Sequence, residues 1–417
     1  MKTVVHITAH LGGGVGRILS NLAIHSLKQN NIEHIIITLE ETENKQFEKI
    51  CNQNNIKVYL ANECDLIGIL DHADIVQLDW WHHPLTSEFM IKYLDKIQCR
   101  LVIWSHISGI SYPYIPIKLI RYADIFIFST PYSLENEFWS QDEKNHILNN
   151  TKVIVSSGLE INEAVNKKVH NEFNIGYVGF LNYSKTHPEF VKYCEAVSDI
   201  PNVKFKIVGD KSYGKELIKD VSNSTLLKGK FDFLGYSNDV CECFEQFDVF
   251  GYILNPKHYG TAENVLLEAM ASGVVPIVLN QGCEKYIVEN KVTGLVVNNI
   301  DEYQIAVKWL YNNPDKCRIL SCNASKYIID KYHIKNTVVE MNEVYNEIIN
   351  RPKILHNAKG VIGETPYDWF LSCYKGELNK IQDNAFAETK GSVKHYLKYF
   401  VNDIRLRKVV ENNESRN

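Results

Sequence analysis

Two successive series of strand-like runs, with helical or loop stretches between the runs, constrain the fold of this chain more than any other feature. The first series lies at residues 3–9, 33–39, 56–60, 74–78, 101–104, 125–129 and 152–155. The second series lies at residues 175–179, 203–208, 231–234, 249–254, 274–279 and 295–297. Strands that alternate with helices form parallel sheets with helices on both faces. The sequence therefore predicts an α/β chain with two doubly wound, Rossmann-like domains.

A polar stretch at residues 161–172 separates the two series and is the expected linker. The chain has 417 residues, which is enough for two or three domains of ordinary size. We predict a first domain over residues 1–165, a second domain over residues 166–350 and a helical extension over residues 351–417.

Charge, cysteine spacing and hydropathy argue against several functional classes. The net charge of −5 gives no reason to expect a nucleic acid as partner. The 10 cysteines include one close pair, Cys241 and Cys243, and lack the paired spacing of a zinc site, which favours reduced thiols. The apolar run at the N-terminus is too short for a signal peptide, and no uninterrupted apolar segment is long enough to span a bilayer. We therefore expect a cytoplasmic protein.

A glycine-rich turn follows the first strand-like run. The segment Leu11-Gly-Gly-Gly-Val-Gly-Arg17 precedes a helix that we expect from about residue 15 to residue 29. A strand, a glycine loop and a helix in this order allow the backbone to approach a phosphate group. Gly13 and Gly14 are therefore candidate ligand contacts. The GxGxxG spacing of dinucleotide-binding proteins is not satisfied, so a glycine turn without a ligand is the alternative.

The stretch 259–279 has the pattern of a loop, a short helix and a buried strand. Thr261 is the expected N-cap of the helix. Glu263 and Asn264 then fall in the first turn, where backbone N–H groups and the positive end of the helix dipole form an anion site. Glu268 follows about one turn later, where it could reach the same ligand. The alternative is a surface helix on which Glu263 only favours the dipole.

This stretch resembles the donor-binding signature of the retaining GT-B glycosyltransferases of family 4, the glycosyl transferases group 1. The segment Asn264-Val-Leu-Leu-Glu268-Ala-Met-Ala-Ser-Gly273 is similar to the second half of that signature. The first glutamate of the signature, which usually contacts the donor sugar, should lie at residue 260, where this chain has Gly260. Either Glu263 substitutes for it, or the donor sugar is held differently.

Further segments extend the resemblance over about residues 1–350. Gly179-Phe-Leu-Asn-Tyr-Ser-Lys185 is similar to a family turn whose arginine and lysine hold the donor diphosphate; Lys185 is retained and Phe180 replaces the arginine. His106 matches a histidine that is often found near the reacting sugar, and a satisfied buried histidine is the alternative. The donor-binding residues that the resemblance implies are Gly13, Gly14, Lys185, Gly209, Tyr236, Thr261, Glu263, Asn264, Val265 and Glu268, and the implied catalytic residues are His106 and Lys185.

The resemblance implies two doubly wound domains that face each other across a cleft. It also implies a retaining, metal-independent hexosyl transfer from a nucleotide sugar carrying UDP or GDP to a glycan, glycolipid or lipid-linked acceptor. Such a reaction serves bacterial surface polysaccharide synthesis. Two alternatives on the same architecture stay open, namely a nucleotide-sugar 2-epimerase and a nucleotide-sugar or glycan-binding protein without catalysis.

No metal ion and no cofactor beyond the nucleotide sugar is expected. The sequence has no Asp-x-Asp motif at a strand end, and Asp79 and Asp239 are isolated from other acidic residues. His82 and His83 are adjacent, so their side chains diverge in an extended chain and make a poor shared metal site. We interpret this pair as loop residues that line a cleft.

Residues 351–417 lie outside the resemblance. Within them, Tyr396, Leu397, Phe400, Val401 and Ile404 share one face of an expected helix, and lysines and arginines surround that face. A basic amphipathic helix can lie on an anionic membrane, which would place the protein peripherally at the cytoplasmic face of the inner membrane. The alternative is a helix that packs on the domains.

Overall fold

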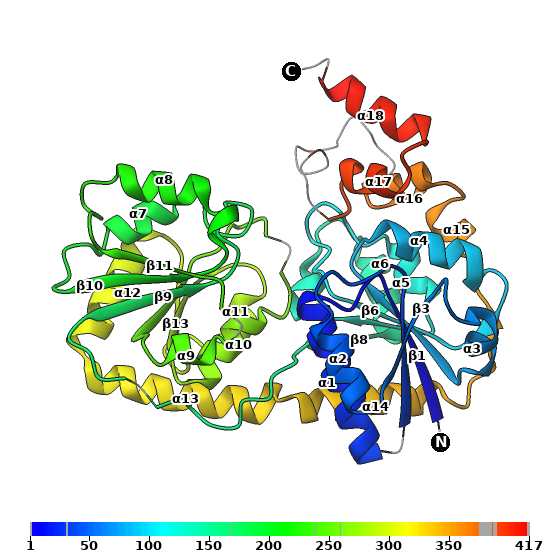
Figure 1. The fold of residues 1–417 in the computed structure, drawn as a ribbon, viewed down its shortest axis with the longest axis horizontal. Coiled ribbons are helices and arrows are strands. Elements are labelled where there is room, and N and C mark those ends of the chain that lie inside the picture. Colours follow the sequence, from blue (N-terminus) through cyan, green and yellow to red (C-terminus); the bar gives the residue numbers. More distant parts are fainter. Residues whose placement is uncertain are drawn as a thin grey trace. The chain divides into compact units, whose positions relative to one another are not determined.

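The computed structural model describes residues 2–30, 32–166, 168–237, 239–258, 260–374, 386 and 390–414. The chain forms two compact units (Figure 1). The first unit comprises Met1–Gly158 and Ile334–Asn417, and the second comprises Leu159–His333. The first unit ends at Gly158, a little before the expected boundary at residue 165. The expected boundary at residue 350 also differs, because the segment after His333 belongs to the first unit.

Seven parallel strands form the sheet of the first unit, in the order β3-β2-β1-β4-β6-β7-β8. The strand order reverses between β1 and β4, and ligands of doubly wound sheets collect at the carboxyl ends of the strands at such a point. The strands are β1 (Lys2–Thr8), β2 (Ile32–Thr38), β3 (Lys57–Leu60), β4 (Ile75–Trp80), β6 (Leu101–Ser105), β7 (Ile125–Phe128) and β8 (Thr151–Val153).

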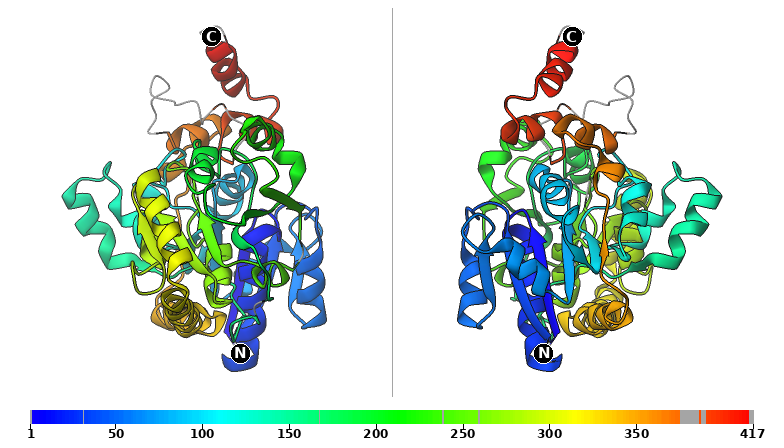
Figure 2. Two further views of the ribbon diagram at one scale, coloured as in Figure 1. Left: turned by 90° about the vertical axis from the view of Figure 1, so that its left-hand side faces the viewer. Right: turned by 90° about the vertical axis from the view of Figure 1, so that its right-hand side faces the viewer.

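Helices cover both faces of this sheet (Figures 1 and 2). The helices of this unit are α1 (Gly13–Asn30), α2 (Gln46–Gln53), α3 (Leu66–His72), α4 (Pro84–Phe89), α5 (Ile117–Tyr122), α6 (Gln141–Ile147), α14 (Ile334–Ile348), α15 (Lys359–Ile362), α16 (Pro366–Ser372), α17 (Val393–Tyr399) and α18 (Ile404–Glu414). Short elements complete the unit, namely the helical turns Met90–Leu94, Pro131–Glu135 and Leu148–Asn150 and the antiparallel pair β5 (Gln98–Cys99) and β15 (Ile354–Leu355).

Helix α14 joins the core of the first unit, although its sequence follows the second series of strands. Val338 and Met341 of α14 are fully buried in one cluster with Val4 of β1, Ile18 of α1 and Trp104 of β6. Each fully buried aliphatic side chain is worth about 1.5–3 kcal/mol relative to exposure, so this packing holds α14 firmly on the first sheet.

The C-terminal segment packs on the first unit and does not form the expected single helix. Helix α17 ends at Tyr399 and α18 begins at Ile404, so the predicted apolar face is divided between two helices. Tyr396 is buried in the core of the first unit, whereas Val401 and Ile404 are exposed. The alternative of a segment packed on the domain therefore describes α17. Residues 375–385, 387–389 and 415–417 of the expected extension lie outside the described residues.

The second unit has a six-stranded parallel sheet in the order β11-β10-β9-β12-β13-β14. Its strands are β9 (Phe173–Val178), β10 (Val203–Val208), β11 (Phe231–Gly235), β12 (Val249–Tyr252), β13 (Val275–Leu279) and β14 (Leu295–Val297). Its helices are α7 (Phe190–Glu195), α8 (Lys215–Asn223), α9 (Cys241–Phe244), α10 (Asn264–Ala271), α11 (Glu284–Ile287), α12 (Ile300–Asn312) and α13 (Pro314–Tyr332), with a helical turn at Lys211–Tyr213. The predicted pair of doubly wound domains is confirmed. Within the described residues, no helix combines the length and the apolar character needed to cross a membrane.

Candidate functional site

Three glycines stand side by side at the carboxyl ends of β9, β10 and β11. Gly179 donates its backbone N–H to Val208 O at 3.0 Å, and Gly209 donates to Gly235 O at 2.9 Å. A Cβ at Gly209 would lie 2.2 Å from Gly179 O, so only glycine fits there. Tyr236 follows Gly235 and is 69% exposed. The structure thus places Gly209 and Tyr236 at the strand ends where a doubly wound sheet takes its ligand.

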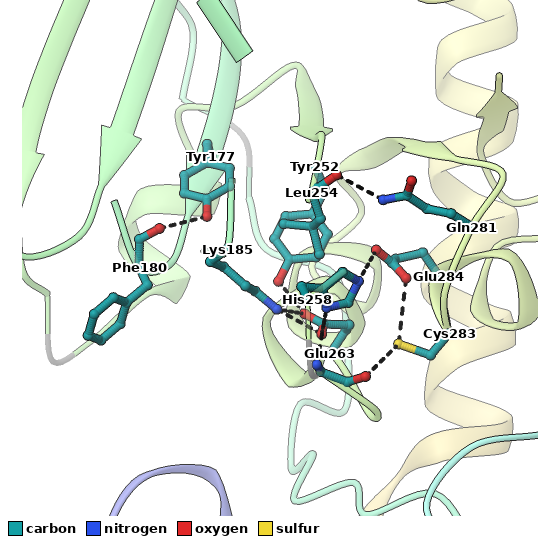
Figure 3. Close-up of polar contacts among 11 residues, drawn as sticks. Tyr177, Phe180, Lys185, Tyr252, Leu254, His258, Glu263, Gln281, Cys283 and Glu284 are labelled. Atoms are coloured by element: carbon teal, nitrogen blue, oxygen red, sulfur yellow. Dashed lines mark hydrogen bonds and ion pairs between the residues drawn. The ribbon is translucent and has the colours of Figure 1, made fainter. Parts of the chain in front are cut away.

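Lys185 forms an ion pair with Glu263 beside these strand ends (Figure 3). The Lys185 Nζ atom lies 2.8 Å from Glu263 Oε1 and 2.6 Å from Glu263 Oε2. The Tyr252 hydroxyl, at the end of β12, donates a further hydrogen bond to Glu263 Oε2. Asn255 N donates to Lys185 O at 2.9 Å and fixes the lysine backbone. Two donors from different segments therefore hold one buried carboxylate.

Burial and charge act in opposite directions on this pair. Burial raises the pKa of the Glu263 carboxyl, but the Lys185 ammonium and His258 together outweigh burial and hold that pKa below its usual range. Burial lowers the pKa of Lys185, but Glu263 more than compensates, so the net shift of that pKa is upward. The two side chains are therefore oppositely charged at neutral pH. Burial, and then Glu263, raises the pKa of Tyr252, which keeps its hydroxyl protonated as a donor.

The backbone of Glu263 is left-handed, with φ 40° and ψ 56°. Such a conformation costs an ordinary residue about 1–2 kcal/mol relative to the right-handed region. Glu263 is the N-cap of α10, so the prediction that Thr261 caps this helix is wrong. Among the described residues, the Glu263 side chain makes no capping hydrogen bond and points to Lys185 instead. A strained non-glycine residue whose side chain is used elsewhere indicates a functional position.

Gly260 has no room for a side chain because the Glu263 carboxylate fills the space. A Cβ at Gly260 would lie 1.6 Å from Glu263 Oε1 and 3.0 Å from His258 Nδ1. The glutamate that the resemblance leads us to expect at residue 260 is absent, and the Glu263 carboxylate fills the space in which its side chain would begin.

His258 continues the network away from Lys185. Its Nδ1 atom lies 3.6 Å from Glu263 Oε1 and its Nε2 atom lies 2.9 Å from Glu284 Oε1. His258, Glu284 and Tyr252 are all buried, and the sequence analysis missed them. Tyr252 could have been found from its place near the carboxyl end of the predicted run 249–254, whereas nothing in the sequence pairs His258 with Glu284.

Helix α10 presents the remaining residues of the donor signature. Asn264 and Val265 lie half-buried in its first turn, Thr261 is buried just before it, and Glu268 is buried one turn further along. Gly273 follows the helix with φ 77°, and its N–H bonds Met270 O at 2.9 Å, as expected for a glycine that ends a helix.

In the first unit, His106 is held by a buried carboxylate. His106 follows β6, and its Nε2 atom lies 2.9 Å from Asp79 Oδ1 at the neighbouring end of β4. Burial raises the pKa of Asp79, but the hydrogen bond from His106 and the nearby His6 ring, whose Nδ1 atom is 3.6 Å from Asp79 Oδ2, outweigh burial and leave that pKa lowered. An ionised Asp79 fixes the Nε2–H tautomer of His106. Asp79 pairs in register with Trp104 of β6, which brings it next to the strand end that carries His106.

The glycine loop and the histidine pair differ in part from expectation. Helix α1 begins at Gly13, two residues earlier than predicted, and Gly13 has φ 58°. His83 lines a pocket, as predicted, but His82 is buried with its Nδ1 atom 3.2 Å from Cys373 Sγ. Within the described part of the chain, no group of three or more His, Cys, Asp or Glu side chains is placed to hold a metal ion.

Comparison with known proteins gives one matching family and one curated relative. Residues 160–327 match the family model described as glycosyl transferases group 1. A segment of 164 residues is 27% identical to the Escherichia coli UDP-Gal:alpha-D-GlcNAc-diphosphoundecaprenol alpha-1,3-galactosyltransferase. That match covers 39% of this chain and 41% of the relative, so it spans less than half of either protein.

Solved structures resemble this chain over most of its length. The crystal structure of Anabaena Alr3699/HepE in complex with UDP superposes with a TM-score of 0.64 at 16% identity, covering 83% of this chain and 100% of that chain. The crystal structure of TarM superposes with a TM-score of 0.65 at 13% identity, covering 83% and 99%. These likenesses show that the chain has the GT-B fold.

Proposed function

We propose that this chain is a retaining glycosyltransferase of family 4 that transfers a sugar from a nucleotide-sugar donor to a hydroxyl of a glycan or lipid-linked acceptor. The observation that carries the proposal is the ion pair between the half-buried Lys185 and the buried Glu263, at strand ends inside the segment that matches the group 1 family. A cation for a diphosphate and a carboxylate for sugar hydroxyls are the two groups that a nucleotide-sugar donor requires.

Lys185 stabilises the leaving group in this proposal. Negative charge develops on the diphosphate as the glycosidic bond breaks, and a positioned cation lowers the energy of that state. The first turn of α10, at Asn264 and Val265, adds backbone N–H groups and the positive helix end. Phe180, where the family carries arginine, supplies no charge, so Lys185 bears more of this role.

Glu263 contacts the donor sugar, and Glu268 binds the ribose. The Glu263 carboxylate and the donor diphosphate are both negatively charged and would repel each other. The Lys185 ammonium, which pairs with Glu263, weakens that repulsion and lets the carboxylate lie close to the donor sugar. Its remaining lone pairs accept hydrogen bonds from sugar hydroxyls. Gly209 and Tyr236 line the nucleotide side, and Gly13, Gly14 and Thr261 complete the proposed donor contacts.

The acceptor proton passes to the leaving phosphate, so no separate general base is assigned. Lys185 supplies the positive charge that a metal ion would otherwise provide, so no metal ion is assigned either. His106, oriented by Asp79, is the proposed contact for the reacting sugars. The names of the relatives support a UDP-sugar donor and a lipid-linked glycan acceptor, since one acts on a diphosphoundecaprenol-linked sugar and another was crystallised with UDP. A role in bacterial polysaccharide synthesis at the cytoplasmic face of the membrane follows from the same proposal.

The test is incubation with labelled UDP-galactose, UDP-glucose and UDP-N-acetylglucosamine, with and without a polyprenyl-diphosphate-linked sugar, while free UDP is measured. Acceptor-dependent release of UDP, with an NMR coupling that shows the donor anomeric configuration in the product, is the expected result. Interconversion of nucleotide sugars without an acceptor would instead identify an epimerase. Tight binding without turnover would identify a binding protein.

A further inference from the structure

A pocket of about 350 Å³ opens in the first unit at the point where the strand order reverses. Its walls come from the loops after β1, β2 and β4 and from the C-terminal segment 390–399. The residues that carry the argument are His10, Glu40, Trp81, His83, Lys390 and Tyr399. The volume lies within the range of small-molecule sites, and the place is where doubly wound sheets bind ligands.

Glu40 is a fixed hydrogen-bond acceptor in this pocket. Tyr399 donates its hydroxyl to Glu40 Oε2 at 2.8 Å, and His83 Nε2 lies 3.2 Å from Glu40 Oε1. Burial raises the pKa of Glu40, but the close contact with His83 and the hydrogen bond from Tyr399 outweigh burial, so the carboxylate is ionised at neutral pH. Each carboxylate oxygen still has a lone pair for a ligand hydroxyl.

Aromatic rings are part of the lining of the pocket. The Trp81 ring contacts the rings of His10 and His83, with centroids 4.9 Å and 4.8 Å apart. The Lys390 ammonium lies 4.2 Å from the centre of the Trp81 ring, where a ligand would replace it. The Tyr399 ring is half-buried and packs against His83 at 4.8 Å. A fixed carboxylate among aromatic rings suits a ligand with hydroxyl groups and apolar C–H faces.

The charge around the pocket disfavours an anionic ligand. The lining carboxylates of Glu40, Glu41 and Glu43 outnumber the ammonium groups of Lys390 and Lys398. The three lining imidazoles do not alter this balance. Burial lowers the pKa of His10 to about 4 and that of His395 to about 3, and it also lowers the pKa of His83, so all three are neutral at neutral pH. Gly12 and Gly13, from the loop proposed to contact the donor, also line this pocket. A uronic acid would meet the net negative lining of carboxylates, whereas a neutral sugar would not.

We propose that this pocket binds a neutral sugar unit of the acceptor, and that the C-terminal segment 390–399 determines which sugar is accepted. This proposal rests on the proposed transferase function. The match to the family ends at residue 327, so the segment is a feature of this chain rather than of the matched domain. Glu40 accepts the sugar hydroxyls, and Tyr399 holds Glu40 in place while closing one wall.

The first test compares Glu40→Gln and Tyr399→Phe with the control Glu33→Gln, a half-buried β2 residue that pairs with Lys57 outside the pocket. We expect the acceptor KM to rise about 10-fold or more in both pocket variants, as for loss of a hydrogen bond to a charged group. The donor KM and the slow hydrolysis of the nucleotide sugar without acceptor should stay at wild-type values. An unchanged acceptor KM in both pocket variants would overturn the proposal.

A second test does not need turnover and therefore separates failure of this proposal from failure of the transferase function. Saturation-transfer NMR with the full chain would compare methyl glycosides of glucose, galactose and N-acetylglucosamine with glucuronic acid and glucose 6-phosphate. We expect signals from a neutral glycoside that disappear in Glu40→Gln and persist in Glu33→Gln. Stronger binding of the anionic sugars, or no binding of any neutral glycoside, would contradict the assignment.

Discussion

The Glu263 carboxylate occupies the position in which a side chain at Gly260 would begin. A Cβ at residue 260 would lie 1.6 Å from Glu263 Oε1, a separation that no pair of non-bonded atoms can have. The site therefore has room for one carboxylate, and this chain supplies it from residue 263. The left-handed backbone of Glu263, at φ 40°, turns that carboxylate toward Lys185.

Gly260→Ala should disrupt this arrangement. The new methyl group must displace the buried carboxylate, and overpacking of this kind costs about 1–3 kcal/mol of unfolding free energy. We expect a lower melting temperature and reduced donor turnover. The double variant Gly260→Glu/Glu263→Gly places a carboxylate at residue 260 and a glycine at the left-handed position, so it should recover part of both losses. A double variant as impaired as Gly260→Ala would show that the two positions do not exchange roles.

Lys185→Ala should lower turnover by a factor of about 10²–10³, which is typical for loss of one group that stabilises a developing anion. Steady-state kinetics with saturating donor measure this effect. Lys192→Ala is the matched control. Lys192 lies in α7 and forms an exposed ion pair with Glu189 at the start of that helix. Near-normal turnover in Lys185→Ala would remove this lysine from the mechanism.

Glu268→Gln should raise the donor KM and change kcat less. If Glu268 holds the ribose, it interacts alike with the bound donor and with the transition state, and such uniform binding is expressed mainly in KM. Glu216→Gln, at an exposed position in α8, serves as the control. A fall in kcat with no change in KM would assign Glu268 to the chemical step instead.

Turnover should persist in excess chelator. The sequence has no acidic pair at a strand end that could hold a diphosphate-bound ion, and Lys185 supplies the neutralising charge. The measurement is the rate of UDP release before and after addition of EDTA. Complete loss of activity that magnesium or manganese restores would rule out the metal-independent mechanism.

Much of the fold could be predicted from the sequence. The strands form from short, buried runs rich in β-branched residues, and the predicted runs at residues 203–208 and 295–297 coincide with β10 and β14. The place of α14 could not be predicted, because an apolar face such as that of Val338 and Met341 fits the core of either unit. Only the packing shows that this helix returns to the first sheet.

The site residues that lie in short sequence motifs could be predicted from the sequence. Lys185 and Glu263 were both proposed from motifs, and the structure brings them together although they are 78 residues apart. The start of α10 was misjudged because a left-handed glutamate is rare and has no sequence signature. His258 and Glu284 were missed because their contact depends on how two loops fold, not on a motif.

The central claim is that Glu263 contacts the donor sugar. The most direct test compares how strongly wild type and Glu263→Gln discriminate among donor sugars. The measurement is kcat/KM for one nucleotide sugar and for its series of monodeoxy analogues, with Glu284→Gln as the control from the same network. A site that hydrogen-bonds a hydroxyl rejects the analogue lacking it by as much as about 10⁴-fold. We predict that wild type and Glu284→Gln reject one deoxy analogue strongly and that Glu263→Gln does not. Equal discrimination by wild type and Glu263→Gln across the whole series would contradict the account.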